Sequence, residues 1–118
     1  MVEFDFCFWH YGFTYIVSKT GKSFGVLQKY FGAGGTIVTP EDAINVGDFA
    51  FSRCRRLENI VLSEKVTNIG YGAFEYCDNL MFLSIPDRVK KLEPYVTYGC
   101  EKMTVLYLPP DMETIDFA

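Results

Sequence analysis

The chain has 118 residues, the length of a single domain. Hydrophobic residues make up 49% of it and aromatic residues 17%, a composition that excludes an intrinsically disordered chain. The formal net charge of −4 argues against nucleic acid or an anionic membrane surface as the main partner. The sequence contains no apolar run of about 20 residues, so it predicts no membrane-spanning helix.

The first 23 residues predict a β-hairpin that covers one end of the structure that follows. Residues 2–8 (VEFDFCF) alternate apolar and other residues, which predicts a strand with one apolar face. Residues 13–18 (FTYIVS) predict a second extended run, and residues 19–23 (KTGKS) predict a turn. Glu3 and Asp5 interrupt the apolar run that a secretory signal needs, so the chain as written is expected to be cytoplasmic.

A glycine-rich stretch, GAGG at 32–35, does not predict a phosphate-binding loop. Such a loop needs a Lys followed by Ser or Thr at the start of a helix, whereas here a predicted strand follows. We expect these glycines to bend the chain into the first repeat.

After this stretch the chain repeats itself every 23 residues. AINVGDFAFSRC at 43–54 returns as VTNIGYGAFEYC at 66–77. The recurring positions form a cysteine column, two aliphatic columns and a proline column: Cys54, Cys77, Cys100; Ile37, Ile60, Leu83, Leu106; Val46, Ile69, Leu92, Ile115; Pro40, Pro86, Pro109. Self-similarity at a period of this length indicates a repeat protein in which each copy buries its apolar side against its neighbours.

Each copy predicts one coil of chain made of short extended pieces and a helical turn. In the second copy, residues 57–62 (LENIVL) alternate with the period of a strand, and residues 66–70 (VTNIG) predict a second extended piece. Residues 71–77 (YGAFEYC) are long enough for one helical turn. This register places Phe51 and Phe74 in one column, where they are predicted to stack in the core.

The third copy departs from the pattern. Val96 and Thr97 stand where the second copy has an Ala and the buried Phe. Loss of a buried Phe leaves a costly cavity, so Tyr95 or Tyr98 is expected to turn inward as a substitute.

Two of the copies resemble a known family. LENIVLSEKVTNIGYGAFEYC and LMFLSIPDRVKKLEPYVTYGC are similar to the repeat of the BspA-like, or Treponema-type, leucine-rich repeat family, roughly L-x-x-I-x-I-P-x-x-V-x-x-I-G-x-x-A-F-x-x-C. The resemblance implies a right-handed coil with a parallel concave sheet. Together with the helical turns and the N-terminal hairpin predicted above, it gives the expected fold class: a β-rich repeat solenoid with short helical turns on the convex side and an N-terminal β-hairpin cap. The single domain, residues 1–118, would then comprise a capping hairpin and lead-in segment (1–33) and about three and a half 23-residue repeats (34–118). Members of this family are commonly cell-surface proteins that bind other proteins or host molecules, and they are not enzymes.

The cysteines and the single histidine predict no catalytic, cofactor-binding or metal-binding residue. Cys54, Cys77 and Cys100 fall one copy apart in a row, which is poor geometry for the tetrahedral ligands of zinc. A disulfide between neighbours is within backbone reach but leaves one thiol unpaired, and we favour buried free thiols because cysteine often packs as a small hydrophobe. His10 has no second histidine beside which to bind a metal or to activate a nucleophile.

The charged residues favour solvated ladders over a binding patch. Arg53, Arg55 and Arg56 form the one basic cluster, and Asp78 falls one copy beyond Arg55. Arg88 and Asp111 are similarly predicted to face one another.

Outward-facing strand positions form the candidate partner-binding face. They are Val38, Asn59, Val61, Met81, Phe82, Ser84, Val105 and Tyr107. The larger of these side chains are unusually apolar for the surface of a soluble monomer, and repeat proteins commonly bind partners on their concave face. The sequence therefore favours a non-catalytic protein–protein interaction module with a protein partner of unknown identity. Burial of this face under the N-terminal hairpin or against a second copy is the alternative.

The C-terminal part of the repeat predicts self-association. The strand around residues 105–108 is the last one with a full set of inward residues, and Pro109 and Pro110 limit pairing along its edge without preventing it. We expect a two-fold homodimer with Val105 and Tyr107 at or beside the contact, which makes a structural or self-assembly module the alternative function.

Overall fold

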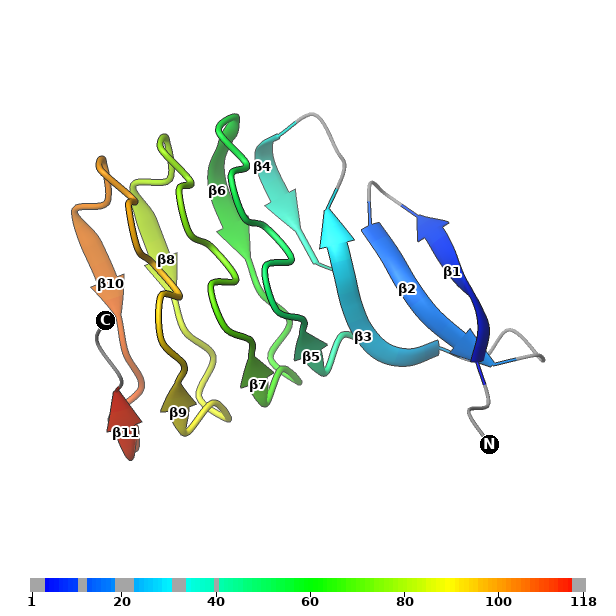
Figure 1. Ribbon diagram of the computed structural model, residues 1–118. Helices are drawn as coiled ribbons and strands as arrows, with labels where there is room; N and C mark the ends of the chain where they lie inside the picture. Colours follow the sequence, from blue (N-terminus) through cyan, green and yellow to red (C-terminus); the bar gives the residue numbers. More distant parts are fainter. Residues whose placement is uncertain (1–3, 11–12, 19–22, 31–33, 40, 116–118) are drawn as a thin grey trace.

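A computed structural model describes residues 4–10, 13–18, 23–30, 34–39 and 41–115 of the protein (Figure 1). Short β-strands and turns make up this part of the chain. The strands are β1 Phe4–His10, β2 Phe13–Ser18, β3 Ser23–Tyr30, β4 Gly35–Val38, β5 Asn45–Val46, β6 Leu57–Val61, β7 Asn68–Ile69, β8 Phe82–Ser84, β9 Lys91–Leu92, β10 Val105–Tyr107 and β11 Thr114–Ile115. No helix within these ranges has the length and hydropathy needed to cross a bilayer.

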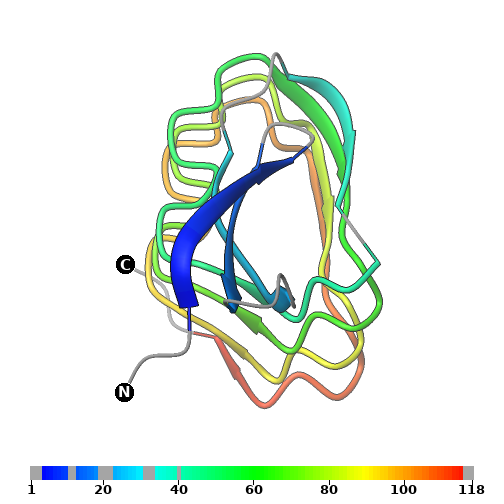
Figure 2. The same ribbon diagram turned by 90° about the vertical axis from the view of Figure 1, so that its right-hand side faces the viewer.

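The N-terminal strands form an antiparallel meander that joins the repeat through β3. The two predicted extended runs form β1 and β2, which pair antiparallel, and β2 pairs antiparallel with β3. Strand β3 then pairs parallel with β5, so that the sheet runs β1-β2-β3-β5-β7. Strands β1 and β2 lie beyond β3 at one end of the molecule (Figures 1 and 2). The apolar face predicted for residues 2–8 comprises Val2, Phe4, Phe6 and Phe8. It lies outside what the structure describes, because Val2 is not among the described residues and only the backbone of β1 is described.

The copies of the repeat lie side by side, each following the same path (Figures 1 and 2). Strands β4, β6, β8 and β10 come from successive copies and form one row, and β5, β7, β9 and β11 form another. Pairing is parallel between residues 23 apart, as in Val38 with Val61 and Leu106 with Leu83. The 23-residue register read from the sequence is therefore the spacing of neighbouring strands.

The ladder of strands is interrupted between the second copy (57–79) and the third (80–102). Strand β4 pairs with β6 and β8 pairs with β10, but within the described residues β6 forms no ladder with β8, nor β7 with β9. These two copies are joined through their turns, where the Phe74 N–H donates to the Val96 carbonyl at 2.9 Å and the Tyr76 N–H to the Tyr98 carbonyl at 2.7 Å. The single continuous parallel sheet expected from the resemblance is thus divided in two.

The core consists of columns of equivalent side chains from successive copies. Phe51 and Phe74 are fully buried and stack with ring centroids 5.0 Å apart and planes 9° apart, which confirms the predicted column. Tyr30, at the end of β3, extends it by stacking on Phe51 at 5.5 Å. Fully buried aliphatic side chains form the parallel columns: Val46, Ile69, Leu57, Leu80, Leu83, Val66 and Val89.

The segments predicted to form helical turns are not helical. In the first copy, alternate N–H groups bond across to the next copy, as Phe51 does to the Ala73 carbonyl at 2.8 Å, while those between bond locally, as Ser52 does to the Phe49 carbonyl at 3.1 Å. A helix would need every N–H for its own chain. Positive φ angles at Phe49 (58°) and Arg53 (61°) also end any helical run. The bonds between copies therefore replace the helix.

Neither tyrosine of the third copy fills the place of the missing phenylalanine. Tyr98 is 46% exposed, and its ring meets that of Tyr95 edge-on at 5.3 Å. Tyr95 in turn contacts Tyr71, another exposed ring, at 5.3 Å. Phe74 is nevertheless fully buried, and Val96 beside it is buried as well. The expectation that Tyr95 or Tyr98 turns inward was wrong, because both rings join an aromatic row on the outside of the turns.

Candidate interaction surface

The predicted partner-binding residues lie on and around strands β4, β6, β8 and β10. Large apolar side chains project from these strands into solvent: Val38 is 67% exposed, Val61 56%, Phe82 44%, Val105 48% and Tyr107 52%. They alternate with inward side chains such as Ile60 and Leu83, which are buried. We call this set the strand surface.

The register fixes which of these side chains are neighbours. Val38 pairs with Val61 across β4 and β6, and Val105 pairs with Phe82 across β8 and β10. Tyr107 lies opposite Ser84, which is partly buried. Within each pair of strands, apolar neighbours therefore stand side by side on the outer face.

Two further members of the predicted set have smaller roles. Asn59 is exposed, and its Nδ2 donates to the Thr36 hydroxyl of the neighbouring copy at 3.5 Å. Met81 precedes β8 and is half exposed, and its carbonyl accepts the Thr104 N–H at 2.9 Å. These contacts tie adjacent copies together at the edge of the strand surface.

A groove of about 610 Å³ crosses the strand surface where the ladder between β6 and β8 is open. Its walls combine exposed apolar side chains with a charged rim: Ile60, Val61, Leu62, Glu64, Lys65, Phe82, Ser84, Ile85, Pro86, Asp87, Arg88 and Tyr107. A hollow of about 340 Å³ adjoins it along the second copy, lined by Val38, Thr39, Glu41 and residues 61–65. Sequence reasoning missed the charged rim, although its four residues, Glu64, Lys65, Asp87 and Arg88, occupy two neighbouring columns just after the strands.

One aliphatic column begins with a polar residue, the buried Thr39, whose hydroxyl is hydrogen-bonded. It stands where later copies have Leu62, Ile85 and Leu108. Its hydroxyl donates to the Val61 carbonyl at 3.2 Å and accepts the Ser63 N–H at 2.8 Å. The position beside the hollow is therefore satisfied internally.

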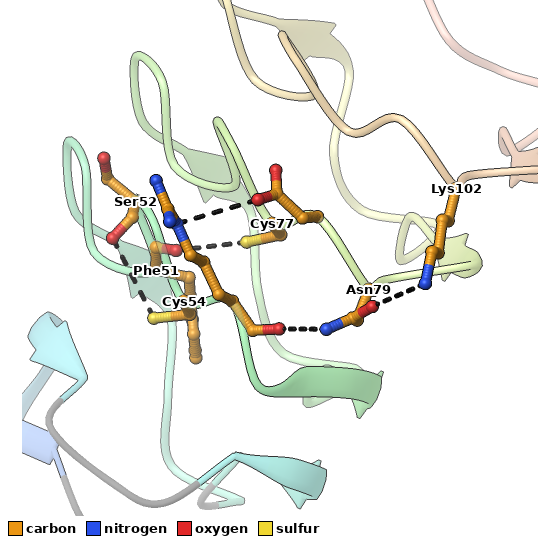
Figure 3. A network of polar contacts seen from close by, with 8 residues as sticks. Phe51, Ser52, Cys54, Cys77, Asn79 and Lys102 are labelled. Carbon is orange, nitrogen blue, oxygen red and sulfur yellow. Dashed lines mark hydrogen bonds and ion pairs between the residues drawn. The ribbon is translucent and has the colours of Figure 1, made fainter.

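The cysteine column is structural in its contacts. The thiol of Cys77 donates to the Phe51 carbonyl of the preceding copy at 3.1 Å (Figure 3). The thiol of Cys100 donates in the same way to the Phe74 carbonyl at 3.0 Å. Cys54, Cys77 and Cys100 are free thiols in this structure. Hydrogen bonding with Cys100, together with burial, raises the pKa of Cys77, which keeps its thiol protonated and unreactive. Among the described residues no His, Cys, Asp or Glu cluster has a metal-binding arrangement.

Charged residues follow the predicted ladders in part. Arg55 Nε lies 3.6 Å from Asp78 Oδ2, as expected. Asp111 is instead approached by Lys90, with Nζ 4.0 Å from Oδ2, so the predicted pairing of Arg88 with Asp111 was wrong. Both pairs are exposed and contribute little to stability.

Comparison with known structures identifies the fold. At 23% identity and a TM-score of 0.78, the chain is similar to the crystal structure of the T. pallidum leucine-rich repeat protein, over 88% of this chain and 50% of that one. A leucine-rich cell surface protein from Faecalibacterium prausnitzii is similar at 16% identity and a TM-score of 0.59, over 90% of this chain and 38% of that one. A leucine-rich repeat protein from Bacteroides capillosus has 17% identity and a TM-score of 0.51, over 97% and 99% of the two chains. The chain thus spans 50% of the length of the T. pallidum protein and 38% of the length of the F. prausnitzii protein.

The family assignment rests on the repeat itself. No match was found among the curated proteins. The model of the family described as "BspA type Leucine rich repeat region (6 copies)" matches residues 34–117, the stretch in which the 23-residue columns occur. The protein therefore belongs to the BspA-type leucine-rich repeat family, with its parallel-stranded repeat fold.

Proposed function

We propose that the protein is a non-catalytic protein–protein interaction module that binds its partner on the strand surface. The observation that carries the proposal is the exposure of Val38, Val61, Phe82, Val105 and Tyr107 on one face. Apolar side chains gathered in this way commonly mark an interaction site on a soluble protein. We further propose that the repeat forms a right-handed solenoid and that this surface is its concave side.

The groove supplies an anchor point for such a partner. Its volume of about 610 Å³ lies within the range of about 300–1,000 Å³ that is usual for binding pockets. Phe82 and Tyr107 line it together, and aromatic side chains are enriched among the residues that dominate interface energies. A charged rim of Glu64, Lys65, Asp87 and Arg88 supplies the polar border of an interface.

A displayed random-peptide library tests this assignment. Peptides are selected on the unmodified chain and then measured against Phe82→Lys/Tyr107→Lys and against Tyr98→Lys. Tyr98 is the matched control, because it is 46% exposed against 44% for Phe82 but lies on the turns. We expect selected peptides to lose at least tenfold in affinity for the double variant, about 1.4 kcal/mol, and to keep their affinity for the control. Peptides that lose affinity only for Tyr98→Lys would place the binding surface on the turns instead.

A second copy of the chain is the alternative occupant of the strand surface. Val105 and Tyr107 are each about half exposed on β10, where a two-fold contact would bury them. Light scattering at a chain concentration of about 100 µM, which detects dimers with dissociation constants in the micromolar range, separates the two proposals. A dimer that Val105→Lys/Tyr107→Lys converts to a folded monomer supports self-assembly, and a monomeric unmodified chain rejects it.

A further inference from the structure

We infer that a hollow beside the first turn, distinct from the strand surface, binds a phosphate or sulfate monoester. The hollow has a volume of about 340 Å³. It is lined by Tyr30, Gly34, Ser52, Arg53, Cys54, Arg55, Arg56 and Leu57. Three of the four arginines of the chain lie here, in a protein whose net charge is −4. It adjoins the start of β6, whereas the groove of the strand surface adjoins the end of that strand.

The backbone that carries the three arginines is fixed from both sides. The Arg56 carbonyl accepts the Gly35 N–H at 2.7 Å, and the Arg53 N–H donates to the Glu75 carbonyl of the next copy at 2.8 Å. Gly34, at φ 92°, lies so close that an added Cβ would come within 2.5 Å of the Arg56 backbone. Because the chain is held on both sides, the arginine side chains start from fixed positions, and less ordering is needed when a ligand binds.

Their guanidinium groups are only partly neutralised. Arg55 is paired with Asp78 at 3.6 Å, and that contact is exposed. The Arg53 guanidinium lies over the Tyr76 ring, 4.6 Å from its centroid, which orients the cation without cancelling its charge. Within the described part of the chain Arg56 forms no ion pair. The Glu75 carboxylate, which accepts the Ser52 hydroxyl at 2.9 Å, and the Asp78 carboxylate together offset two of the three arginine charges, so one net positive charge is left beside the hollow.

This surplus fits a tetrahedral oxyanion better than a carboxylate. A guanidinium is a planar fork of donors that matches oxyanions bidentately, and a carboxylate has oxygens enough for about one such fork. A monoester phosphate or sulfate presents three terminal oxygens, so it can engage several forks at once. The volume of 340 Å³ is near the lower end of the range of ligand pockets, which suits one ester group with one attached ring.

Calorimetric titration of the full chain with three small probes tests the inference. Phenyl phosphate and phenyl sulfate are compared with phenylacetate, which has the same ring and a carboxylate. We expect a monoester to bind at least about tenfold more tightly than phenylacetate, and its affinity to fall as salt is added. The tighter binding of phenyl phosphate or of phenyl sulfate identifies which of the two monoesters the site recognises.

Arginine variants locate the binding. Arg53→Gln/Arg56→Gln is expected to weaken monoester binding by about tenfold or more for each charge removed. Arg88→Gln is the matched control, since it removes the one arginine outside the hollow and should leave affinity unchanged. Thermal unfolding checks that each variant is folded; if the double variant is not, Arg56→Gln alone decides, because among the described residues no ion pair holds that side chain.

Three results would overturn the inference. One is the absence of measurable heat with either monoester at about 10 mM ligand, which corresponds to an interaction weaker than about 3 kcal/mol. Another is an equal loss in the Arg88 control, which would mean general attraction to positive charge. The third is phenylacetate binding as tightly as the esters, which would assign the hollow to carboxylates of an acidic peptide. None of these results depends on a partner on the strand surface.

Discussion

The left-handed positions of the turns hold aromatic residues, glycines and one arginine: Phe49, Arg53, Gly72, Tyr76, Tyr95 and Gly99. Gly72 has φ 58°, and a Cβ added there would come within 2.6 Å of the Phe49 ring from the preceding copy. Gly99 has φ 73°, and an added Cβ would come within 2.5 Å of the Tyr76 ring. Each glycine therefore serves two purposes: it adopts a backbone conformation that disfavours side chains, and it leaves room for a neighbouring ring.

We predict that Gly72→Ala destabilises the protein more than Gly35→Ala does. Both glycines have positive φ, so both changes introduce the left-handed strain of about 1–2 kcal/mol. Only Gly72 meets a ring, whereas an added Cβ at Gly35 has nothing within 4 Å. Urea unfolding measures both. Adding Phe49→Ala should cancel the extra loss at Gly72, and a strictly additive double variant would contradict this explanation.

The raised pKa of Cys77 predicts a pH dependence of stability. The folded state favours the protonated thiol, so its contribution is full below the unfolded pKa of about 8.5 and is lost as the pH rises above that value. Urea unfolding at a series of alkaline pH values should show this loss in the unmodified chain and a smaller one in Cys77→Ala. Identical pH slopes for the two proteins would show that the Cys77 thiol has the same pKa in the folded and unfolded states, which contradicts the raised folded pKa.

At the scale of elements, the packing of each copy on the next determines stability. Phe74 is fully buried in the aromatic column and stacks on Phe51 at 5.0 Å. We predict that Phe74→Ala lowers the free energy of unfolding by about 3–5 kcal/mol because of the cavity that it leaves. Phe49→Ala, at a ring that is 42% exposed, is the comparison and should cost much less. A loss below about 1 kcal/mol at Phe74 would contradict the buried column.

The interrupted ladder predicts unequal protection of three equivalent amides. Thr39 donates its N–H to the Val61 carbonyl and Ile85 donates to the Tyr107 carbonyl, both at 3.0 Å. The equivalent N–H of Leu62 has no backbone acceptor in the described part of the chain. In native-state hydrogen exchange Leu62 should therefore exchange faster than Thr39 and Ile85. Equal protection of all three would mean that the ladder closes in solution.

For the whole molecule, the repeat period carried most of the information in the sequence. The resemblance of the repeat to a known family correctly predicted the family and the parallel strands, and the 23-residue step correctly predicted the column of Phe51 and Phe74. These features depend on columns of similar residues, which a single sequence displays. The binding role of the strand surface stays a prediction.

Features that depend on competition between bonds were not predictable in this way. Whether the Phe51 N–H bonds along its own chain or to the Ala73 carbonyl is decided by how copies stack, so the turns were wrongly predicted to be helical. Tyr95 and Tyr98 turned outward because neighbouring rings were available on the surface. The hollow with Arg53 and Arg56 was also not predicted, because arginine does not recur at these positions in the other copies and the repeat pattern therefore does not point to them.

The open ladder between β6 and β8 also affects how the molecule deforms. Backbone bonds join these two copies along the turns and are missing along both rows of strands, within the described residues. The turns therefore hold the two copies together, and the two strand rows at this junction can separate while the turns stay bonded. Bending that spreads the strands at this junction breaks no hydrogen-bonded ladder, whereas the same bend between β8 and β10 breaks one. The groove lies at this junction, so widening it between β6 and β8 breaks no backbone ladder of the described strands.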